Sequence, residues 1–385
     1  MILSPRLRAT ALPPIPAARA WAARYAGAAG PALDLTQAVP GYPPPPDLLA
    51  HLAEAAGSAA AAGYGPIAGD EALRAALAAD IGARYGAPIA PAEVAITAGC
   101  NLAFAMVMAA LAAEGEAVLL PTPHYFNHHM TLTLQGARPI PLPTRAEDGF
   151  VPDPARVESL LAAHRARAVV LVSPNNPTGA VYPPAVIAAI AAICRRHGAA
   201  LVLDETYRDF VAGTPHALFQ DPDWRDVLVH LYSFSKAYCV PGHRIGAVVA
   251  GAAFQGEFAK ALDTLQICPS RPAQAALAWA VPALGAWREG NRALMAARAQ
   301  LFRDAVSPLP GWRLEAIGTY FAYLRLPEAA PDAMQAAEQL AAEAGLLTLP
   351  GPFFGPGQDR HLRLAFANAA EDVLRAVPAR LAHLR

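Results

Sequence analysis

Short runs of apolar residues alternate along most of the chain with longer segments of helical spacing. The runs predict strands over 93–97, 116–121, 137–143, 166–174, 199–205, 226–233 and 245–251. The helical spacing predicts helices over 47–62, 70–85, 102–113 and 185–198, with Gly198 as the C-cap of the last. Nearly continuous apolar strands that alternate with helices are typical of a mainly parallel sheet covered on both faces. The pattern therefore predicts an α/β fold.

The two ends of the chain depart from this pattern. Residues 1–46 are rich in proline and end in "PGYPPPP", which predicts an extended arm. A long helix over 287–306 precedes short strands and further helices, which indicates a smaller α+β unit. The expected organisation is therefore an arm (1–46) that joins the small domain, a large domain (47–285) and a small C-terminal domain (286–385).

Composition narrows the functional classes. Of the 385 residues, 55% are hydrophobic and 16% are charged, which is typical of a globular protein. The net charge of −1 gives no reason to expect a nucleic acid or a membrane surface as a partner. The four cysteines lack metal-ligand spacing, so we expect no metal site and a reducing, cytoplasmic environment. We expect neither a signal peptide nor a membrane-spanning helix.

Polar segments follow the predicted strands at their carboxyl ends, where parallel sheets bind ligands. They are "TAGCN" (97–101), "PTPHYFNHH" (121–129), "SPNNPTG" (173–179), "DETY" (204–207) and "SFSKAYCVPGHRIG" (233–246). Each alone has an ordinary explanation: a turn for "NNPTG", a helix cap for Asp204 and a surface position for Lys236. Their occurrence together at one edge of a sheet favours a common site.

The chemistry of these segments is complementary. Lys236, flanked by hydroxyl groups, can form a Schiff base with an aldehyde if its pKa is lowered. Small residues at the start of a helix bind phosphate, and the planar fork of Arg244 suits the same group. An acid such as Asp204 keeps a heteroaromatic nitrogen protonated. A cofactor that combines an aldehyde, a phosphate and a pyridine nitrogen is pyridoxal 5′-phosphate (PLP).

The chain resembles the class I/II aminotransferases, which are fold-type I PLP enzymes. Three motifs support the resemblance: "NPTG", D-x-x-Y, and S-x-S-K followed eight residues later by Arg244. The resemblance extends from "YGPIAGDEALR" (64–74) to "HLRLAFA" (361–367). It implies a three-layer αβα large domain with a mainly parallel seven-stranded sheet, plus a smaller α+β domain. It also implies a ping-pong transfer of an α-amino group from an L-amino acid to a 2-oxo acid.

The resemblance assigns roles to the strand-end residues. Lys236 is the Schiff-base lysine and the acid/base that moves the substrate proton. Asp204 pairs with the pyridine nitrogen, and Tyr207 and Asn176 bind the phenolic oxygen of the cofactor. Tyr125 stacks on the pyridine ring. The residues implied in phosphate binding are Gly99, Cys100, Asn101, Ser233, Ser235, Arg244 and Tyr64, the last from a neighbouring subunit. A homodimer with shared active sites follows from that resemblance.

Further residues are implied around the substrate. Arg363 matches the arginine that binds the α-carboxylate, with Asn176 beside it, and His128 matches a histidine that orients Asp204. Family members often have Gly-x-Pro where this chain has Ala38-Val39-Pro40, so the substrate contact is assigned to the N–H of Val39. Aromatic residues expected to line a side-chain pocket are Tyr42, Tyr320 and Phe321. Glu205 points away from Asp204 by strand alternation, and we expect it to be structural or solvated.

Three alternatives follow from the same residues. A PLP-dependent decarboxylase or β-C–S lyase uses the same scaffold, because fold and cofactor do not determine the reaction. A non-catalytic PLP-binding regulator is disfavoured, since no basic helix-turn-helix pattern precedes the first core helix. A nicotinamide enzyme is disfavoured because no G-x-G-x-x-G follows a strand.

Overall fold

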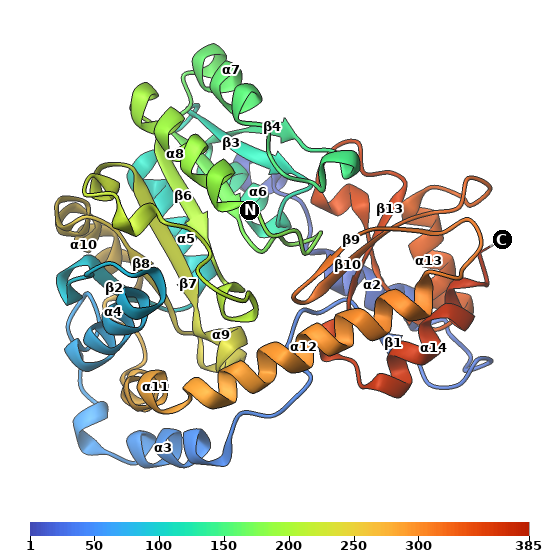
Figure 1. Cartoon of the computed structure of the whole chain (residues 1–385), viewed down its shortest axis with the longest axis horizontal. Helices are drawn as coiled ribbons and strands as arrows, with labels where there is room; N and C mark the ends of the chain where they lie inside the picture. The colour runs from blue at the N-terminus through green and yellow to red at the C-terminus, as the bar shows by residue number, and fades with distance from the viewer. Residues whose placement is uncertain (385) are drawn as a thin grey trace.

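Residues 1–384 are described by a computed structural model, in which a seven-stranded sheet forms the centre of the larger of two lobes (Figure 1). Its strands are β2 (Val94–Thr97), β3 (Ala117–Thr122), β4 (Arg138–Pro143), β5 (Ala168–Val172), β6 (Ala200–Asp204), β7 (Leu228–Ser233) and β8 (Gly246–Val249). Their order is β2-β8-β7-β6-β5-β3-β4, and only β8 is antiparallel to its neighbours. Each predicted strand is present, and the mainly parallel sheet is confirmed.

Helices cover both faces of this sheet. One layer contains α4 (Glu71–Tyr85), α7 (Pro154–His164), α8 (Pro184–His197) and α11 (Arg271–Ala283), with α3 (Pro46–Ala56) packed on α11. The other contains α5 (Cys100–Leu111), α6 (Phe126–Gln135) and α10 (Ala252–Gln266). Along β5, Val169 and Leu171 enter the first core while Ala168 and Val170 enter the second. This alternation explains why the strands are apolar throughout, and it confirms the three-layer αβα arrangement.

A smaller lobe follows the sheet in sequence. Its antiparallel sheet has the order β12 (Leu349–Pro350), β13 (His361–Ala365), β10 (Phe321–Arg325), β9 (Arg313–Gly318), and it packs with α13 (Ala333–Glu343) and α14 (Glu371–Leu381). Helix α12 (Gly285–Val306) runs between the lobes (Figure 1). Its Trp287 packs on the large-lobe core, whereas Phe302 and Val306 belong to the small-lobe core. The predicted domain boundaries remain predictions, since one continuous helix belongs to both lobes.

The N-terminal segment is not simply extended, and that prediction was wrong. It forms α1 (Pro5–Ala9), α2 (Pro14–Ala22) and the short strand β1 (Leu33–Asp34). Proline is tolerated in the first turn of a helix, so Pro5 and Pro14 mark helix starts. The segment contacts the small lobe, because α2 packs on α13 and β1 pairs with β11 (Leu346–Leu347).

The connections contain short helical segments. They are α9 (Phe234–Ala237) and the 3-10 helices η1 (Ala59–Ala61), η2 (Pro91–Glu93), η3 (Ala146–Asp148), η4 (Arg208–Phe210), η5 (Leu218–Gln220), η6 (Trp224–Asp226), η7 (Pro241–His243), η8 (Gly351–Phe354) and η9 (Phe366–Asn368). Within residues 1–384, no helix combines the length and the apolar character needed to cross a membrane.

Candidate active site

A cavity of about 300 Å³ lies beyond the carboxyl ends of the central strands. Of the predicted site residues it is lined by Val39, Cys100, Asn101, Tyr125, Asn176, Asp204, Tyr207, Ser233, Ser235, Lys236, Arg244 and Arg363. Gly99 lies directly beneath Arg244. Tyr64 is not among the lining residues and is 82% exposed. The fold therefore brings residues from both lobes and the N-terminal segment to one place.

Asp204 ends strand β6 at the floor of the cavity. Its Oδ2 lies 3.3 Å from Nε2 of His128, and its Oδ1 accepts hydrogen bonds from Thr206 N (3.0 Å) and Oγ1 (2.7 Å). Burial alone raises the pKa of this carboxyl, but the bonds from His128 and Thr206 outweigh it and leave the pKa below its usual value. His128 stacks on Phe104, with ring centroids 3.9 Å apart. Asp204 is thus held ionised in a fixed orientation.

Lys236 lies in α9, directly after strand β7. Ser233 caps this turn, because its Oγ accepts a hydrogen bond from Ser235 N at 3.3 Å. The Lys236 amine donates to the carbonyl oxygen of Ala38 in the N-terminal segment. Burial, and then the positive charges of Arg244 and Arg363, lower the pKa of Lys236 to about 8. A much larger fraction of the amine than in an ordinary lysine is therefore neutral and nucleophilic near neutral pH.

The start of α5 and Arg244 form a positive corner of the cavity. Gly99 has a φ of +88°, and a Cβ at this position would lie 2.2 Å from Nη2 of Arg244. The absence of a side chain lets the guanidinium lie over the helix N-terminus, where Cys100 and Asn101 begin α5. Arg244 Nη1 is anchored on the carbonyl of Pro241 at 3.0 Å. A cation above a helix N-terminus provides a favourable site for a phosphate.

Arg363 reaches the cavity from β13 of the small lobe and is 2% exposed. Its Nη1 donates to Asn176 Oδ1 at 3.1 Å, and its Nη2 donates to the carbonyl of Thr36. The guanidinium lies about 5 Å from the ring centres of Phe321 and Phe354. Burial lowers its pKa to about 10, so it remains charged at neutral pH. This arrangement presents a fixed planar cation to the cavity.

Two tyrosines complete the predicted set. Tyr125 Oη lies 3.4 Å from Asn101 Oδ1, which links the aromatic residue to the start of α5. The ring of Tyr207 packs against Tyr320 and Phe321, with centroids 5.2 and 5.3 Å away. Tyr320 and Phe321, together with Tyr42, do not line the cavity, so the expected side-chain pocket was wrong. They form an aromatic cluster behind Tyr207 instead.

Sequence reasoning also missed residues that line the cavity. They are Ile15, Thr36, Gln37, Ala38, Phe126, Val172, Thr206 and Pro241. Thr206 could have been found, because it lies between two predicted site residues and a hydroxyl two residues after an aspartate commonly bonds to it. Phe126 directly follows Tyr125 in the segment 121–129, but no role was assigned to it, whereas the sequence context of Ile15 gives no sign of a site. The N–H of Val39 donates to the carbonyl of Gln37 at 2.9 Å, and its predicted substrate contact remains a prediction.

Glu205 points away from the cavity, as strand alternation predicted. It is fully buried, so the solvated alternative does not apply. Its Oε2 accepts a hydrogen bond from Tyr85 and lies 2.9 Å from His230 Nε2 and 3.3 Å from His216 Nε2. Burial raises the pKa of Glu205, but the two imidazoles outweigh it and lower the pKa overall. Glu205 is therefore a structural carboxylate.

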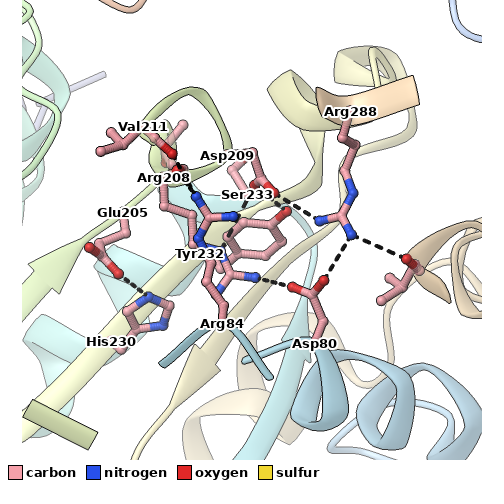
Figure 2. Close-up of polar contacts among 12 residues, drawn as sticks. Asp80, Arg84, Glu205, Arg208, Asp209, Val211, His230, Tyr232, Ser233 and Arg288 are labelled. Atoms are coloured by element: carbon pink, nitrogen blue, oxygen red, sulfur yellow. Dashed lines mark hydrogen bonds and ion pairs between the residues drawn. The ribbon is translucent and has the colours of Figure 1, made fainter. Parts of the chain in front are cut away.

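A buried charge network lies next to this carboxylate. Figure 2 shows Arg288 directed between Asp80 and Asp209, to each of which it donates a hydrogen bond of 2.8 Å. Arg208 contacts Asp80 at 2.6 Å, and Tyr232 donates to Asp209 at 2.8 Å. The network joins α4, η4, β7 and α12, and η4 immediately follows Tyr207. It therefore fixes the turn that carries a predicted site residue.

The residues present fit PLP. The partly neutral amine of Lys236 suits the aldehyde, the ionised Asp204 suits a protonated ring nitrogen, and the corner at Gly99 and Arg244 suits the phosphate. These three features occur in one cavity, which matches the donor set that such a cofactor requires.

The comparison with known proteins identifies the class. Residues 31–381 match the family described as "Aminotransferase class I and II", and the chain belongs to this family. It is 28% identical to an aromatic aminotransferase of Arabidopsis thaliana over 91% of this chain and 88% of that protein. It is 30% identical to a probable aspartate/prephenate aminotransferase of Thermus aquaticus over 86% of this chain and 87% of that protein.

The solved structures agree with this assignment. The aspartate aminotransferase of Thermus thermophilus with maleate superposes with a TM-score of 0.90 at 28% identity, covering 100% of this chain and 99% of that chain. The BacF structure from Bacillus subtilis superposes with a TM-score of 0.89 at 26% identity, over 99% and 97% of the two chains. The chain is therefore a PLP-dependent transaminase of fold type I, and the resemblance seen in the sequence is confirmed.

Proposed function

We propose that the chain transfers the α-amino group of an L-amino acid to a 2-oxo acid in a ping-pong cycle, with Lys236 as the residue that holds the cofactor covalently. The observation that carries the proposal is the position of the Lys236 amine, whose pKa is about 8, in one cavity with Asp204 and Arg363. These side chains supply a nucleophile, a fixed anion and a fixed cation to the same space.

Arg363 binds and orients the substrate. Its planar fork suits a bidentate contact with the α-carboxylate, and Asn176 and Thr36 hold the guanidinium in place. Fixing the carboxylate also fixes the direction of the bond between the α-carbon and its hydrogen. Orientation of this kind contributes a large part of enzymatic rate acceleration.

Lys236 moves the proton. When bound, PLP supplies an aldehyde that captures the amino group and an electron-withdrawing ring that stabilises negative charge at the α-carbon. With PLP bound, the Lys236 amine would take the proton from the substrate α-carbon and donate it to the aldehyde carbon of the cofactor, and its lowered pKa suits this acid/base role near neutral pH. Asp204, kept ionised by His128 and Thr206, holds a positive charge on the ring nitrogen. Tyr207 and Asn176 are assigned to the phenolic oxygen.

The partner substrates are amino and 2-oxo acids, and the relatives suggest a wide range. Their names include aromatic, aspartate/prephenate and arginine–pyruvate transaminases. A decarboxylase or β-C–S lyase on the same scaffold is the alternative. The match to the aminotransferase family and the transaminase names of the relatives favour transamination.

We also propose a homodimer with shared active sites. Tyr64 is 82% exposed on the loop before α4 and lies outside the cavity of its own chain, which supports a role in a neighbouring subunit. We place the enzyme in the reducing cytoplasm, because its four cysteines, all within residues 1–384, form no disulfide.

The chain offers a clean test of the covalent role, because Lys236 and Lys260 are its only lysines. Borohydride reduction of the PLP-loaded protein should fix the cofactor on Lys236, as read by peptide mass spectrometry. Lys260, exposed on α10, is the matched control. We expect Lys236→Ala to lose the cofactor adduct and turnover, and Lys260→Ala to keep both. Turnover retained in Lys236→Ala would contradict the proposal.

A second measurement separates transamination from the alternative. With an amino acid and no 2-oxo acid, a transaminase stops after one equivalent of product per site, because the cofactor keeps the amino group. Continuous release of ammonia or carbon dioxide under these conditions would assign the chain to the lyase or decarboxylase class.

A further inference from the structure

A second cavity, of about 520 Å³, lies beside the active-site cavity between α6, the start of α2 and the loop after η8. We name it the distal cavity. Its apolar wall contains Leu12, Pro14, Phe126, Met130 and Phe353. It is larger than the active-site cavity and is not used by any step proposed for the amino-group transfer.

The two cavities share one side chain. Phe126, at the start of α6, lines both of them. On α2, Ile15 lines the active-site cavity and the adjacent Pro14 lines the distal cavity. The Phe126 ring lies 5.0 Å from Tyr125 and 5.9 Å from Phe354, measured between ring centres. A half-buried aromatic side chain therefore separates the substrate-binding space from a further apolar space.

Two histidines, His124 and His129, are the polar side chains within the distal cavity, and Asp359 lies at its rim. His124 and His129 are parallel to within 6°, with centroids 5.3 Å apart. Nδ1 of His124 is buried and has no hydrogen-bond partner among residues 1–384. Burial and the neighbouring His129 lower the pKa of His124 to about 3, and burial lowers that of His129. Both rings are consequently neutral at physiological pH.

The charges at the cavity exclude an acidic ligand. Among the described residues that line it, the only ionised side chain is that of Asp359, which is exposed at the rim, and none is a lysine or an arginine. An anionic group would meet one carboxylate and no compensating cation, which makes its desolvation unfavourable. The apolar wall instead suits a ligand that buries hydrocarbon surface.

We propose that the distal cavity receives the end of a long, uncharged, apolar side chain of the amino-acid substrate. The inference rests on the proposed function, in which Arg363 holds the α-carboxylate and Lys236 acts at the α-carbon. Because the α-carboxylate and the α-carbon are both held in place, the side chain is the part of the substrate that can extend past Phe126. A short side chain ends in the active-site cavity, whereas a longer one displaces the Phe126 ring and enters the distal cavity.

The test uses the PLP-loaded holoenzyme and a series of linear L-amino acids, from alanine to 2-aminooctanoate, with one 2-oxo acid. Burial of each additional methylene is expected to raise kcat/KM about four-fold until the cavity is filled. The Kd values of straight-chain carboxylic acids, measured by calorimetry, should fall in parallel. These acids lack the amino group, so their binding is independent of turnover.

Met130→Trp fills the distal cavity from α6, and Leu134→Trp is the matched control. Leu134 lies one turn later on α6, is 48% exposed and does not line the cavity. We expect Met130→Trp to lower the ratio of kcat/KM for 2-aminooctanoate to that for alanine at least ten-fold, and Leu134→Trp to leave this ratio unchanged.

The outcomes separate this inference from the proposed function. If alanine is turned over but kcat/KM does not rise for side chains longer than that of norvaline, the inference is overturned and the transaminase function stands. The same conclusion follows if Met130→Trp leaves the dependence of kcat/KM on chain length unchanged. Chain-length-dependent binding of the carboxylic acids without turnover of any amino acid would show that the distal cavity binds an apolar chain, and it would overturn the proposed function together with the assignment of that chain to an amino-acid substrate. A preference for dicarboxylic amino acids also overturns the inference.

Discussion

Two adjacent carboxylates at the end of strand β6 have opposite environments. Asp204 faces the active-site cavity and bonds to His128 and Thr206, whereas Glu205 is sealed in the opposite core with His216 and His230. Strand alternation alone predicts that they diverge, but it left open whether Glu205 is structural or solvated, and the structure shows it fully buried. The sequence could not show that Glu205 has two imidazole partners, since they come from segments far along the chain.

This contrast yields a paired prediction. Asp204→Asn keeps the shape but removes the charge opposite the cofactor ring, so we expect kcat to fall by roughly 10²- to 10³-fold, the scale of a lost electrostatic contact in an active site. Glu205→Gln should keep kcat within two-fold but lower the free energy of unfolding by about 1–3 kcal/mol, because it disturbs a buried hydrogen-bond cluster. Steady-state kinetics and urea unfolding measure the two effects. Near-normal kcat in Asp204→Asn would show that this acid has another role.

The lowered pKa of Lys236 predicts the pH dependence of its reactivity. The neutral amine is the nucleophile, so in cofactor-free protein the acylation rate of Lys236 should rise about ten-fold per pH unit below pH 8 and level off above it. Trace labelling with peptide mass spectrometry follows Lys236 and the exposed Lys260 in one sample. A Lys236 midpoint no lower than that of Lys260 would contradict the effect of burial and of the neighbouring arginines.

At the scale of elements, local patterns predicted the sheet well and the N-terminal segment poorly. The central strands are recognisable because they are apolar on both faces, as Val169 and Val170 illustrate on β5, whereas the edge strand β4 exposes residues such as Arg138. The helices α1 and α2 were missed because proline was interpreted as a sign of extended chain, although Pro5 and Pro14 occupy first-turn positions. Position in a helix, and not proline content, decides the effect of this residue.

The turn before α5 gives a prediction about the phosphate corner. Gly99→Ala places a Cβ in the space of the Arg244 guanidinium and strains a residue with a φ of +88°, so we expect the Kd for PLP to rise at least ten-fold. Gly115→Ala is the control, since Gly115 has a φ of +81° and the new methyl group would have no neighbouring atom of the described residues within 4 Å. The Gly115→Ala variant should therefore lose stability only through backbone strain and should keep its affinity for PLP. Fluorescence titration with PLP compares the variants, and equal affinities would contradict a role for Gly99.

The network in Figure 2 makes a prediction for α12. Arg288→Met removes a buried cation that pairs with Asp80 and Asp209. We therefore expect the free energy of unfolding to fall by about 3–5 kcal/mol. Arg292→Ala, one turn later, removes only an exposed pair with Glu289 and should cost less than about 1 kcal/mol. Urea titration distinguishes them. If the two variants have equal free energies of unfolding, Arg208 alone is sufficient to neutralise Asp80 and Asp209.

At the scale of the molecule, the site is assembled from three distant parts of the chain. Thr36 belongs to the N-terminal segment, Asn176 to the large lobe and Arg363 to the small lobe, and two hydrogen bonds connect them. The resemblance to the family identified the polar members, because they belong to recognisable motifs. It could not identify Ile15, since its place in the cavity depends only on how the N-terminal segment packs across the sheet edge.

The position of Tyr64 predicts that this assembly extends to a second subunit. Tyr64 is exposed and lies outside the cavity of its own chain, so we expect dimer formation to bury it, and light scattering should then report twice the chain mass of 40.2 kDa. Tyr64→Ala should weaken PLP binding, and Lys236→Ala should be inactive. In a mixture of the two variants, each heterodimer contains one site with both native residues, namely Lys236 of one subunit and Tyr64 of the other. At limiting PLP, mixing should therefore restore activity above the sum of the separate variants. Strictly additive activities from a dimeric mixture that exchanges subunits would show that each site uses residues of its own chain only.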